Sequence, residues 1–491
     1  MRMARRDFLG GAAVLLLSGC GGSPGSSLAA VGGGSTPAPT PTPTPTASVG
    51  SPSSKTFTPE AYGAVGDGRT NDTAAFAAMS AAVNAAGGGT IVLKATTYVV
   101  GAHVADSTGA YAYGPAIIMT FDGCTKPLTI TGNGACLRCA DGLRFGTFDP
   151  LTGAATQHAM PYTGTGELAS PYQGMIIAKN CTAKVSISDV ELDGNIQKLL
   201  IGGQYGDTGW QIPAYGLQLV NNSGGEDIVG VHAHHQPVDG VLIDAPATRT
   251  TQTQLEQVNS EYNVRQGCSV VGGSNFSFSN CKFNHTGKAG MVSAPGAGVD
   301  IESENSPVRN LTFSGCEFSD NSGPGLVADS GDSQGASFDT CRFIGTTCWA
   351  AWPRKPNFQF SDCTFVGAIC NTYGDSDASK AAQFTGCTFE DDAALSPTGQ
   401  VYCDGSPIAD LSSNVNVLFD ECTFKLIGNL VLPWSTGAIY KNVTMSQTSQ
   451  KQAYPRGTYL GTNRIDANVD LADSKINGNV TLNGVLLART A

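Results

Sequence analysis

The sequence predicts an all-β fold, a single-stranded right-handed parallel β-helix whose N-terminal end is covered by a helix. Two observations predict it: six cysteines recur in one local pattern, and five glycine-led segments recur beside them. A short strand that returns every few tens of residues is typical of a solenoid, in which each repeat packs only against its neighbours.

The N-terminal residues predict export rather than structure. Arg5 and Arg6 precede the apolar run 10–17, which is too short to span a bilayer. This order is typical of a twin-arginine signal, and the run leads to Cys20 in a sequence similar to a bacterial lipobox. We therefore expect residues 1–20 to be a lipoprotein signal and Cys20 to carry the lipid. An ordinary signal peptide with a chance cysteine is the alternative.

Residues 21–54 are rich in Gly, Ser, Thr and Pro, a composition that cannot bury a core, so they predict an extended tether. The remaining residues, 55–491, form the predicted β-helix domain. We expect the domain to lie in the cell envelope, at the outer membrane or facing the periplasm, and to touch a membrane only through its lipid. The net charge of −12 and the absence of a basic run argue against a nucleic-acid partner.

The first part of the domain predicts a turn, a helix and a strand. Residues 61–68 are rich in turn-forming glycine and aspartate, and Asn71 or Asp72 can cap a helix. Phe76, Met79 and Val83 would then lie on one face of this helix, as a cover for the open end of the solenoid requires. Three glycines stop the helix before a strand that begins at Thr90.

The cysteine repeat is an apolar residue, two variable residues, Cys, one variable residue and Phe. Its copies are Phe278-Cys281-Phe283, Phe313-Cys316-Phe318, Phe338-Cys341-Phe343, Phe360-Cys363-Phe365, Phe384-Cys387-Phe389 and Phe419-Cys422-Phe424. They lie 35, 25, 22, 24 and 35 residues apart. Equivalent positions stack at about 4.8 Å, so we expect one Cys ladder flanked by Phe ladders.

We expect these six thiols to be free, because side chains in one core column need not have disulfide geometry and a buried Cys packs as a small apolar residue. No CxxC pair or His accompanies each copy, which argues against a metal site. One disulfide among Cys124, Cys136, Cys139 and Cys181 is left open.

The glycine-led segments place acidic side chains on an outer surface. They begin at Gly216, Gly240, Gly267, Gly298 and Gly325, and the residue after each glycine is apolar. Alternation predicts one outer column of Gln218, Leu242, Ser269, Asp300 and Val327, and a second of Val220, Asp244, Val271, Glu302 and Asp329.

This arrangement brings together Asp300, Glu302 and Asp329, the predicted catalytic residues. Asp300 and Glu302 would lie about 6.6 Å apart along a strand, and Glu302 and Asp329 about 4.8 Å apart on adjacent coils. Glycoside hydrolysis needs two carboxyl groups, about 5 Å apart for retention and about 6.5–9.5 Å for inversion. Like charges this close raise one pKa and so supply the protonated acid. Arg265, on the neighbouring coil, would clamp a sugar or hold Asp300.

No cofactor is required by this chemistry, although the same acids could bind calcium through their oxygens. A solvated strand face is the alternative for any single acid. Asp244, in the second outer column, is a candidate substrate contact.

Four further residues are substrate-binding candidates. Tyr205 and Trp210 lie in the long excursion 196–213, which would wall a groove and stack on sugar rings. His234 would alternate with His232 on a strand and could transfer a proton, and Lys288 precedes the Asp300 strand and could line a rim. Trp349 and Trp352, with Arg354 and Lys355, could extend the groove, with core packing as the alternative for the tryptophans.

The run Ala61-Tyr62-Gly63-Ala64-Val65-Gly66-Asp67-Gly68, with Asn71-Asp72-Thr73 and Gly88-Gly89-Thr90, resembles the N-terminal signature of the pectate-lyase-like superfamily. This group includes rhamnogalacturonase, epimerase and phage-tailspike β-helices. The resemblance covers residue 57 to the C-terminus and implies the fold and a polysaccharide substrate. Members hydrolyse, eliminate, epimerise or only bind, so it does not imply one reaction. Many β-helices of this type form trimers, which makes a homotrimer an expectation.

The chain lacks the Gly-His-Gly motif of polygalacturonases and the Tyr-Gly-Phe-Asp-Pro run of mannuronan epimerases. Three hypotheses follow. The first is a polysaccharide hydrolase that uses the acid cluster. The second is a lyase on a uronic-acid polymer, with His234 or Lys288 as base and Arg265 or calcium at the sugar carboxylate. The third is a non-catalytic glycan-binding or structural β-helix. The sequence specifies neither the sugar, nor its linkage, nor the stereochemical outcome.

Overall fold

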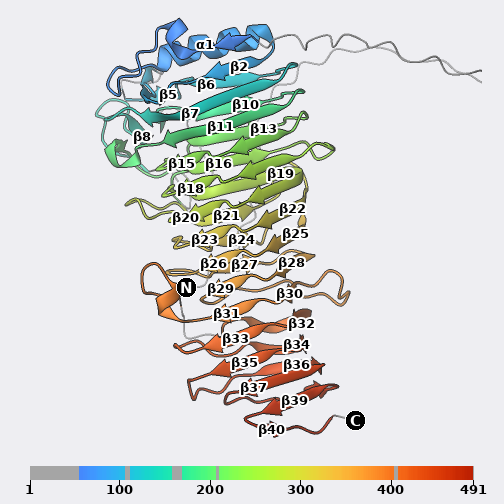
Figure 1. Cartoon of the computed structure of the whole chain (residues 1–491). Coiled ribbons are helices and arrows are strands. Elements are labelled where there is room, and N and C mark those ends of the chain that lie inside the picture. The colour runs from blue at the N-terminus through green and yellow to red at the C-terminus, as the bar shows by residue number, and fades with distance from the viewer. Residues whose placement is uncertain (1–54, 106–110, 158–167, 206–208, 403–406, 490–491) are drawn as a thin grey trace, which may run out of the picture. The chain divides into compact units, whose positions relative to one another are not determined.

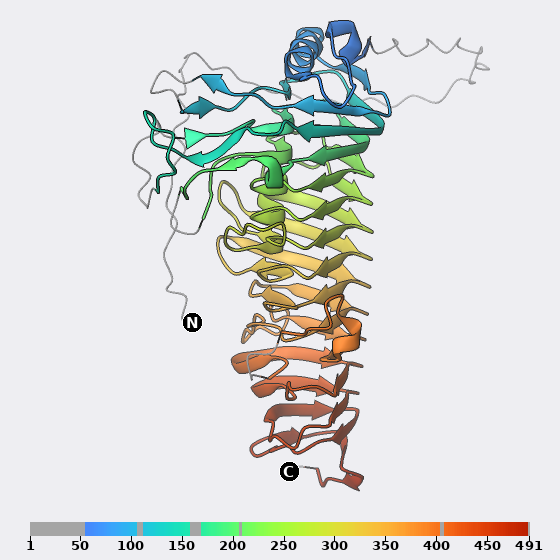
Figure 2. The same ribbon diagram turned by 90° about the vertical axis from the view of Figure 1, so that its left-hand side faces the viewer.

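The chain folds into a right-handed parallel β-helix, which confirms the predicted fold class. The computed structural model describes residues 55–105, 111–157, 168–205, 209–402 and 407–489. Strands of successive coils pair in parallel and stack one above another (Figure 1), and the same stack is seen edge-on in Figure 2. The predicted signal, Cys20 and the tether lie outside the described residues.

Three ladders of parallel strands form the walls of the solenoid, and the chain passes through them in the order one, two, three in each coil. Ladder one comprises β1 (Thr56–Phe57), β2 (Gly89–Val92), the first parts of β7 (Leu128–Cys139) and β11 (Val185–Asp193), β14 (Glu226–Val229), β17 (Thr253–Glu256), the second part of β19 (Gln266–Ser279), β22 (Val308–Ser314), β25 (Ser333–Asp339), β28 (Phe358–Ser361), β30 (Gln383–Thr385), β32 (Asp410–Asp420), β34 (Trp434–Lys441), β36 (Pro455–Leu460) and β38 (Lys475–Ile476).

Ladder two follows it around the coil. It comprises β3 (Thr97–Val100), the second parts of β7 and β11, β15 (His232–His234), β18 (Asn259–Glu261), β20 (Lys282–Asn284), β23 (Glu317–Ser319), β26 (Arg342–Ile344), β29 (Thr364–Val366), β31 (Thr388–Glu390), β33 (Thr423–Leu426), β35 (Thr444–Gln447), β37 (Thr462–Asp466) and β39 (Asn479–Leu482), which pairs antiparallel with β40 (Val485–Leu486).

Ladder three is shorter. It comprises β6 (Met119–Asp122), β10 (Gly174–Lys179), β13 (Tyr215–Val220), β16 (Asp239–Asp244), the first part of β19, β21 (Ala297–Ile301), β24 (Leu326–Ala328) and β27 (Ala351–Pro353).

The core contains the predicted Phe and Cys ladders. Phe278 and Phe313 pair in register, and their rings stack with centroids 4.4 Å apart at an interplanar angle of 4°. Cys316 lies between the Phe columns, where its thiol donates to the carbonyl oxygen of Phe278 at 3.5 Å. The six repeat cysteines are buried and free, as predicted. Burial and stacking therefore account for this repeat without a disulfide.

The four earlier cysteines, for which one disulfide was left open, are free as well. Cys124, Cys139 and Cys181 are buried and Cys136 is partly buried. The side chains of Cys124 and Cys181 share a hydrogen bond between neighbouring coils.

The glycine of each ladder-three segment permits close approach of the next coil. A Cβ atom on Gly267 would lie 2.5 Å from the carbonyl oxygen of Gly298, and one on Gly298 would lie 2.5 Å from that of Gly325. A side chain at any of these positions would push the coils apart, which explains why glycine aligns the segments in the sequence.

Helix α1 (Thr73–Ala86) follows the 3₁₀ turn η1 (Pro59–Tyr62) near the N-terminal end of the stack (Figure 1). Phe76, Met79 and Val83 are fully buried, which confirms the predicted apolar face. The carboxylate of Asp72, the residue before the helix, accepts the backbone N–H groups of Val65 and Gly66, at 2.7 and 3.1 Å, and so closes the preceding turn. None of the helices in the described part of the chain is long and apolar enough for a membrane span.

A second, five-stranded sheet is built from insertions between ladders two and three of the first coils. Its strands, in spatial order, are β12 (Leu200–Ile201), β8 (Arg144–Thr147), β9 (Leu168–Ala169), β5 (Tyr113–Gly114) and β4 (Val104–Ala105). The insertions project to one side of the stack in Figure 2. The insertion after β11 includes the 3₁₀ turn η2 (Ile196–Lys198), and a third such turn, η3 (Ala393–Leu395), follows β31.

Candidate active site

The outer face of ladder three carries the predicted column of side chains. Ser269 pairs with both Leu242 and Asp300, and Asp300 pairs with Val327, so the first outer column is confirmed. Beyond its predicted end, the column continues to Trp352, which pairs with Val327. An aromatic side chain thus stands two coils from Asp300 on the same face.

The second predicted column is correct at its start and wrong at the third position. Asp244 pairs with Val220 as predicted, but a bulge places it opposite Gly272 instead of Val271. The bulge adds one residue to β19, and a Cβ at Gly272 would lie 2.4 Å from Oδ1 of Asp244. Asp244 accepts a hydrogen bond from Nδ2 of Asn305 at 2.9 Å, and partial burial raises its pKa.

Asp300 is the most strongly perturbed acid of this face. It is 8% exposed, and its Oδ2 accepts a hydrogen bond from Nε2 of Gln266 at 2.5 Å. Burial, and secondly the nearby charge of Glu302, raise its pKa well above the ordinary value for an aspartic acid. Arg265 opposes this rise. Asp300 therefore has the environment of a carboxyl group that stays protonated.

Glu302 and Asp329 follow β21 and β24 directly, past the last paired residues of these strands. Oε1 of Glu302 accepts a hydrogen bond from Oγ of Ser330 at 2.5 Å. Burial and the charge of Glu302 raise the pKa of Asp329, whereas Lys355 and Arg354 lower it. The three predicted acids thus interact electrostatically, as the sequence analysis required.

A buried acid that was not predicted, Asp239, lies beneath this group. It is completely buried, and its Oδ2 accepts a hydrogen bond from Oγ of Ser269 at 2.8 Å and lies 3.8 Å from Nη1 of Arg265. Burial raises its pKa, and Arg265 and then Ser269 oppose this rise. Oγ of Ser269 also contacts Oε1 of Gln266, so Ser269 and Gln266 connect Asp239 to Asp300.

Arg265 is placed by these contacts among acids. Its side chain is 20% exposed, and its nearest carboxylate is that of Asp239, so it does not hold Asp300 directly. Its Nε atom and Oδ1 of Asp239 are buried, and neither has a hydrogen-bond partner among the described residues. Glu304 was also not predicted as a site residue. Burial raises its pKa above the ordinary value, and Arg265 partly opposes this rise.

These side chains enclose a small cleft with a volume of about 50 Å³. Its lining residues are Tyr215, Leu242, Arg265, Gln266, Ser269, Val271, Asp300, Glu302 and Glu304. A water molecule occupies about 30 Å³ in the liquid, so the cleft has room for a reacting atom or a water beside the acids. We call this group, together with Asp239 and Asp329, the acid cleft.

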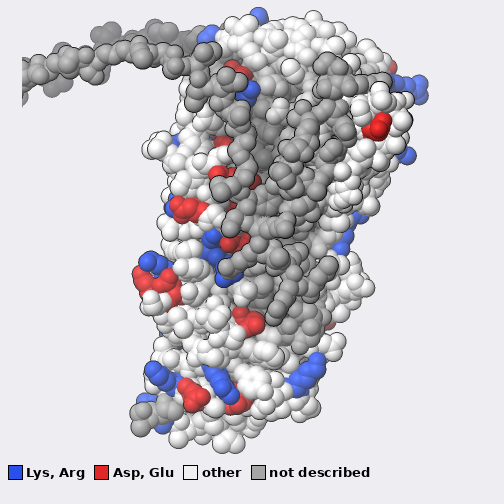
Figure 3. Space-filling view, turned by 180° about the vertical axis from the view of Figure 1, so that it is seen from behind, with Lys and Arg blue, Asp and Glu red and all other residues white. Residues whose placement is uncertain are grey.

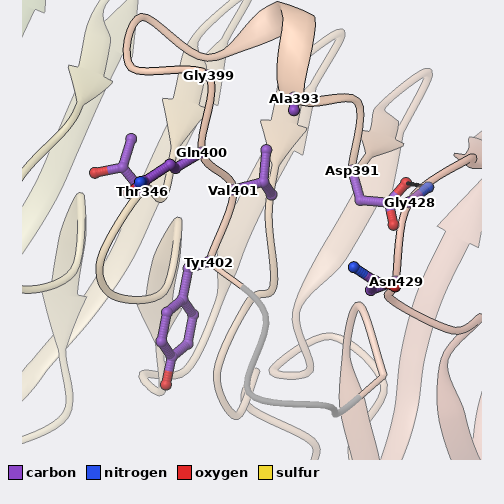
Figure 4. Close-up of a pocket in the computed structure, with 9 residues that line it drawn as sticks. All are labelled: Thr346, Asp391, Ala393, Gly399, Gln400, Val401, Tyr402, Gly428 and Asn429. Carbon is purple, nitrogen blue, oxygen red and sulfur yellow. Dashed lines mark hydrogen bonds between the residues drawn. The ribbon is translucent and has the colours of Figure 1, made fainter.

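A larger cavity of about 450 Å³ lies farther along the chain (Figure 4). Its one carboxylate, Asp391, accepts the backbone N–H groups of Ile427, Gly428 and Leu430 at 2.7, 2.9 and 3.0 Å. That carboxylate closes a turn, and among the described residues that line the cavity no second carboxyl accompanies it. The pair of acids needed for glycoside chemistry is therefore found in the acid cleft.

The predicted aromatic wall, Tyr205 and Trp210, joins the insertion that forms β12. The two residues form a parallel bridge, and Nε1 of Trp210 donates to the carbonyl oxygen of Gly202 at 3.2 Å. The carbonyl oxygen of Trp210 accepts from Oγ of Ser293, whose N–H in turn donates to Val264, the neighbour of Arg265. The excursion thus reaches the coil corner beside the acid cleft, although residues 206–208 are outside the described part.

His234 and Lys288 have partners other than the cleft acids. Nε2 of His234 lies 3.0 Å from Oε1 of Glu191 on ladder two. Nζ of Lys288 lies 3.4 Å from Oδ1 of Asp320 and donates to Oγ1 of Thr347 at 3.2 Å. The structure thus groups the predicted catalytic acids but assigns these two bases to other contacts.

The residues that sequence reasoning missed share one position. Asp239 and Gln266 each precede the glycine of a ladder-three segment and begin their strands. Strict alternation would place the side chains of Asp239 and Gln266 in the core, on the same side as Val241 and Cys268. Both side chains instead contact Ser269 of the outer column. A polar residue directly before the aligned glycine was the available signal.

Among the described residues seen from behind, most are uncharged, and Lys and Arg side chains are scattered over the face, some beside acidic ones and some alone (Figure 3).

Comparisons with known proteins give structural similarities only. No family model matches the chain, and no curated protein matches it. The A-module of a mannuronan C-5 epimerase from Azotobacter vinelandii is 17% identical with a TM-score of 0.44, over 86% of this chain and 100% of that one. The N-terminal fragment of the bacteriophage Phi29 gene 12 product is 13% identical with a TM-score of 0.49, over 88% and 72%.

A tailspike capsular polysaccharide depolymerase from the Acinetobacter baumannii bacteriophage Fri1 is 12% identical with a TM-score of 0.42, over 89% of this chain and 65% of that one. At these identities and scores, the function of the present chain has to be argued from its own residues.

Proposed function

We propose that the chain is an extracytoplasmic polysaccharide-degrading enzyme, a glycoside hydrolase that works in the acid cleft. The observation that carries this proposal is the buried carboxyl group of Asp300, whose pKa is raised by burial and by Glu302 on the outer face of a parallel β-helix. Two carboxyl groups with different environments are what glycoside hydrolysis requires.

In this proposal Asp300 is the general acid. Its raised pKa keeps a proton available for the leaving-group oxygen, and the amide of Gln266 fixes the orientation of its carboxyl group. Glu302, oriented by the hydroxyl of Ser330, is the base or nucleophile. Asp329 interacts with Glu302 electrostatically, and Arg265 balances the negative charge of the cleft.

The polymer would lie along ladder three. Trp352 stands in the Asp300 column, and its side chain is partly exposed. The apolar face of a sugar can stack on the face of such a ring. A chain held to a membrane by lipid on Cys20 would present this face to polysaccharides outside the cytoplasm.

The test is a digestion of a glycan panel by the wild type and by Glu302→Gln. We expect the variant to lose about 10²–10⁴-fold in rate, the range by which a positioned acid–base group accelerates a reaction. Glu256→Gln, on an exposed position of β17, is the control for the loss of one carboxylate and should keep full activity. Turnover by Glu302→Gln at the wild-type rate would refute the assigned site, and glycan binding without turnover by the wild type would favour the non-catalytic hypothesis.

A lyase acting on a uronic-acid polymer is the second candidate, and one observation favours it. The side chain of Arg265 lines the cleft and is 20% exposed, as that of a group that neutralises a sugar carboxylate would be. Elimination leaves an unsaturated uronate that absorbs ultraviolet light, and hydrolysis does not. New ultraviolet absorbance in the digest, lost in Arg265→Lys, would therefore replace hydrolase by lyase.

A further inference from the structure

Beside the acid cleft, ladder two and the corner after it bring two imidazoles and a carboxylate together. β11 and β15 pair in parallel with Asp193 opposite His234. Oδ1 of Asp193 lies 3.7 Å from Nδ1 of His234, and Nδ1 of His234 lies 2.7 Å from Nδ1 of His235. The three groups offer ligand atoms that all lie within 4.8 Å of one another.

Both rings are held in place by further contacts. His235 has left-handed backbone, with φ of 52°, and its ring stacks on Tyr262 with centroids 5.3 Å apart at 12°. Tyr262 stacks in turn on His285 at 4.6 Å and 15°. The Nδ1 atom of His235 is thereby directed at His234 by an aromatic stack that is independent of any metal.

Glu191 fixes the tautomer of His234. Its Oε1 lies 3.0 Å from Nε2 of His234, so this nitrogen carries the proton and Nδ1 presents a lone pair toward His235 and Asp193. A carboxylate behind the distal nitrogen of an imidazole is the usual outer partner of a metal-binding histidine.

We propose that Asp193, His234 and His235 form a binding site for a zinc ion, with the fourth position open to solvent. Two imidazoles and one carboxylate are a known zinc ligand set. Tetrahedral zinc with bonds of about 2.0–2.1 Å needs ligand atoms about 3.3 Å apart. The distances of 2.7 and 3.7 Å lie on either side of this value, and the ligand atoms of Asp193 and His235 lie within 4.8 Å of each other, so side-chain shifts of about 1 Å would bring the three groups around one ion.

The charge and exposure of the site suit a divalent cation. Asp193 and Glu191 bring two carboxylates close to the imidazole of His234, and the side chains of His234 and Asp193 are 12% and 18% exposed. Oδ1 of Asp193 already accepts the backbone N–H of Asn195 at 2.8 Å, which holds the carboxylate but leaves further lone pairs for a metal. Arg138, in register with Asp193 on the preceding coil, is paired with Asp141 at 3.1 Å.

The test is a calorimetric titration of zinc chloride into the chelator-treated full chain, prepared without a histidine tag. Every sample carries Cys20→Ser, so that this thiol binds no zinc. We expect one zinc per chain and a higher melting temperature with zinc. His235→Gln and Asp193→Asn should each lower the affinity more than 100-fold, and Glu191→Gln by about 10–100-fold, the usual loss for an outer partner.

His103→Gln is the matched control, because it removes an imidazole outside this cluster, whose Nε2 accepts the backbone N–H of Arg144 at 2.9 Å. It should bind zinc as tightly as the wild type. Wild-type protein that binds no zinc would overturn the proposal, and so would folded His235→Gln and Asp193→Asn variants with wild-type affinity. Because binding is measured without a glycan, the result is independent of the proposed hydrolase activity.

Discussion

Replacing Asp300 with asparagine should stabilise the fold while removing activity. Asp300 is 8% exposed, and burial and Glu302 raise its pKa. An acid with a higher pKa in the folded state binds more protons when folded, so stability is lost as the pH rises from the unfolded value of about 3.9 through the folded value. Above the folded value the cost is constant, at roughly 1.4 kcal/mol for each pKa unit of the shift.

The asparagine side chain has the same shape, and its Oδ1 still accepts from Nε2 of Gln266. The substitution therefore removes the cost of the charge and keeps the hydrogen bond. Melting temperatures followed by circular dichroism at pH 8 should rise by about 1 °C per kcal/mol, because the entropy of unfolding scales with chain length. At pH 4 the difference should shrink, since the wild-type carboxyl is then largely protonated.

The control is again Glu256→Gln, which removes one carboxylate from an exposed position and should show no such gain. Asp300→Asn that melts at or below the wild-type temperature at pH 8 would refute the reasoning that this carboxyl is held in an unfavourable environment for catalysis.

Three further predictions concern the groove, a buried ion pair and the core. Trp352→Ala should raise KM for a polymer with little change in kcat, measured by steady-state kinetics, while Trp434→Ala, on ladder one, changes neither. Arg249→Met should cost about 3–5 kcal/mol in thermal or urea unfolding, because it leaves Glu226 as a buried unpaired charge; an unchanged stability would contradict this. Phe338→Ala should cost about 3–5 kcal/mol without changing kcat, since its ring is buried in the core stack of ladder one, whereas the cleft lies on the outer face of ladder three.

The sequence predicted the ladders because their period is regular. The Phe-Cys-Phe repeat and the aligned glycines each report a side chain that meets its own equivalent on the next coil, so local spacing determines the long-range contact. The same logic placed Asp300 beside Ser269 and Val327 correctly.

The prediction failed where the period is interrupted. The bulge in β19 adds one residue and thereby places Asp244 opposite Gly272. The spacing of the glycine-led segments does not indicate this extra residue. Asp239 and Gln266 are the first residues of their strands, directly before the aligned glycines, and the predicted columns, which begin after the glycines, did not include them. The contact between His234 and His235 could not be predicted either. It depends on the left-handed backbone of His235, whose ring stacks on Tyr262 of the next coil.

The Phe and Cys stack has a consequence for how this molecule could vary in length. The coils that contain the Phe-Cys-Phe repeat, from Phe278 to Phe424, have nearly equivalent core side chains. Most of these coils lie beyond those that carry the acid cleft. Because each coil contacts only its neighbours, a whole coil could be added or deleted there, and the coils on either side would still pack against equivalent Phe and Cys side chains. This part of the β-helix could therefore change in length during evolution without altering the residues of the acid cleft.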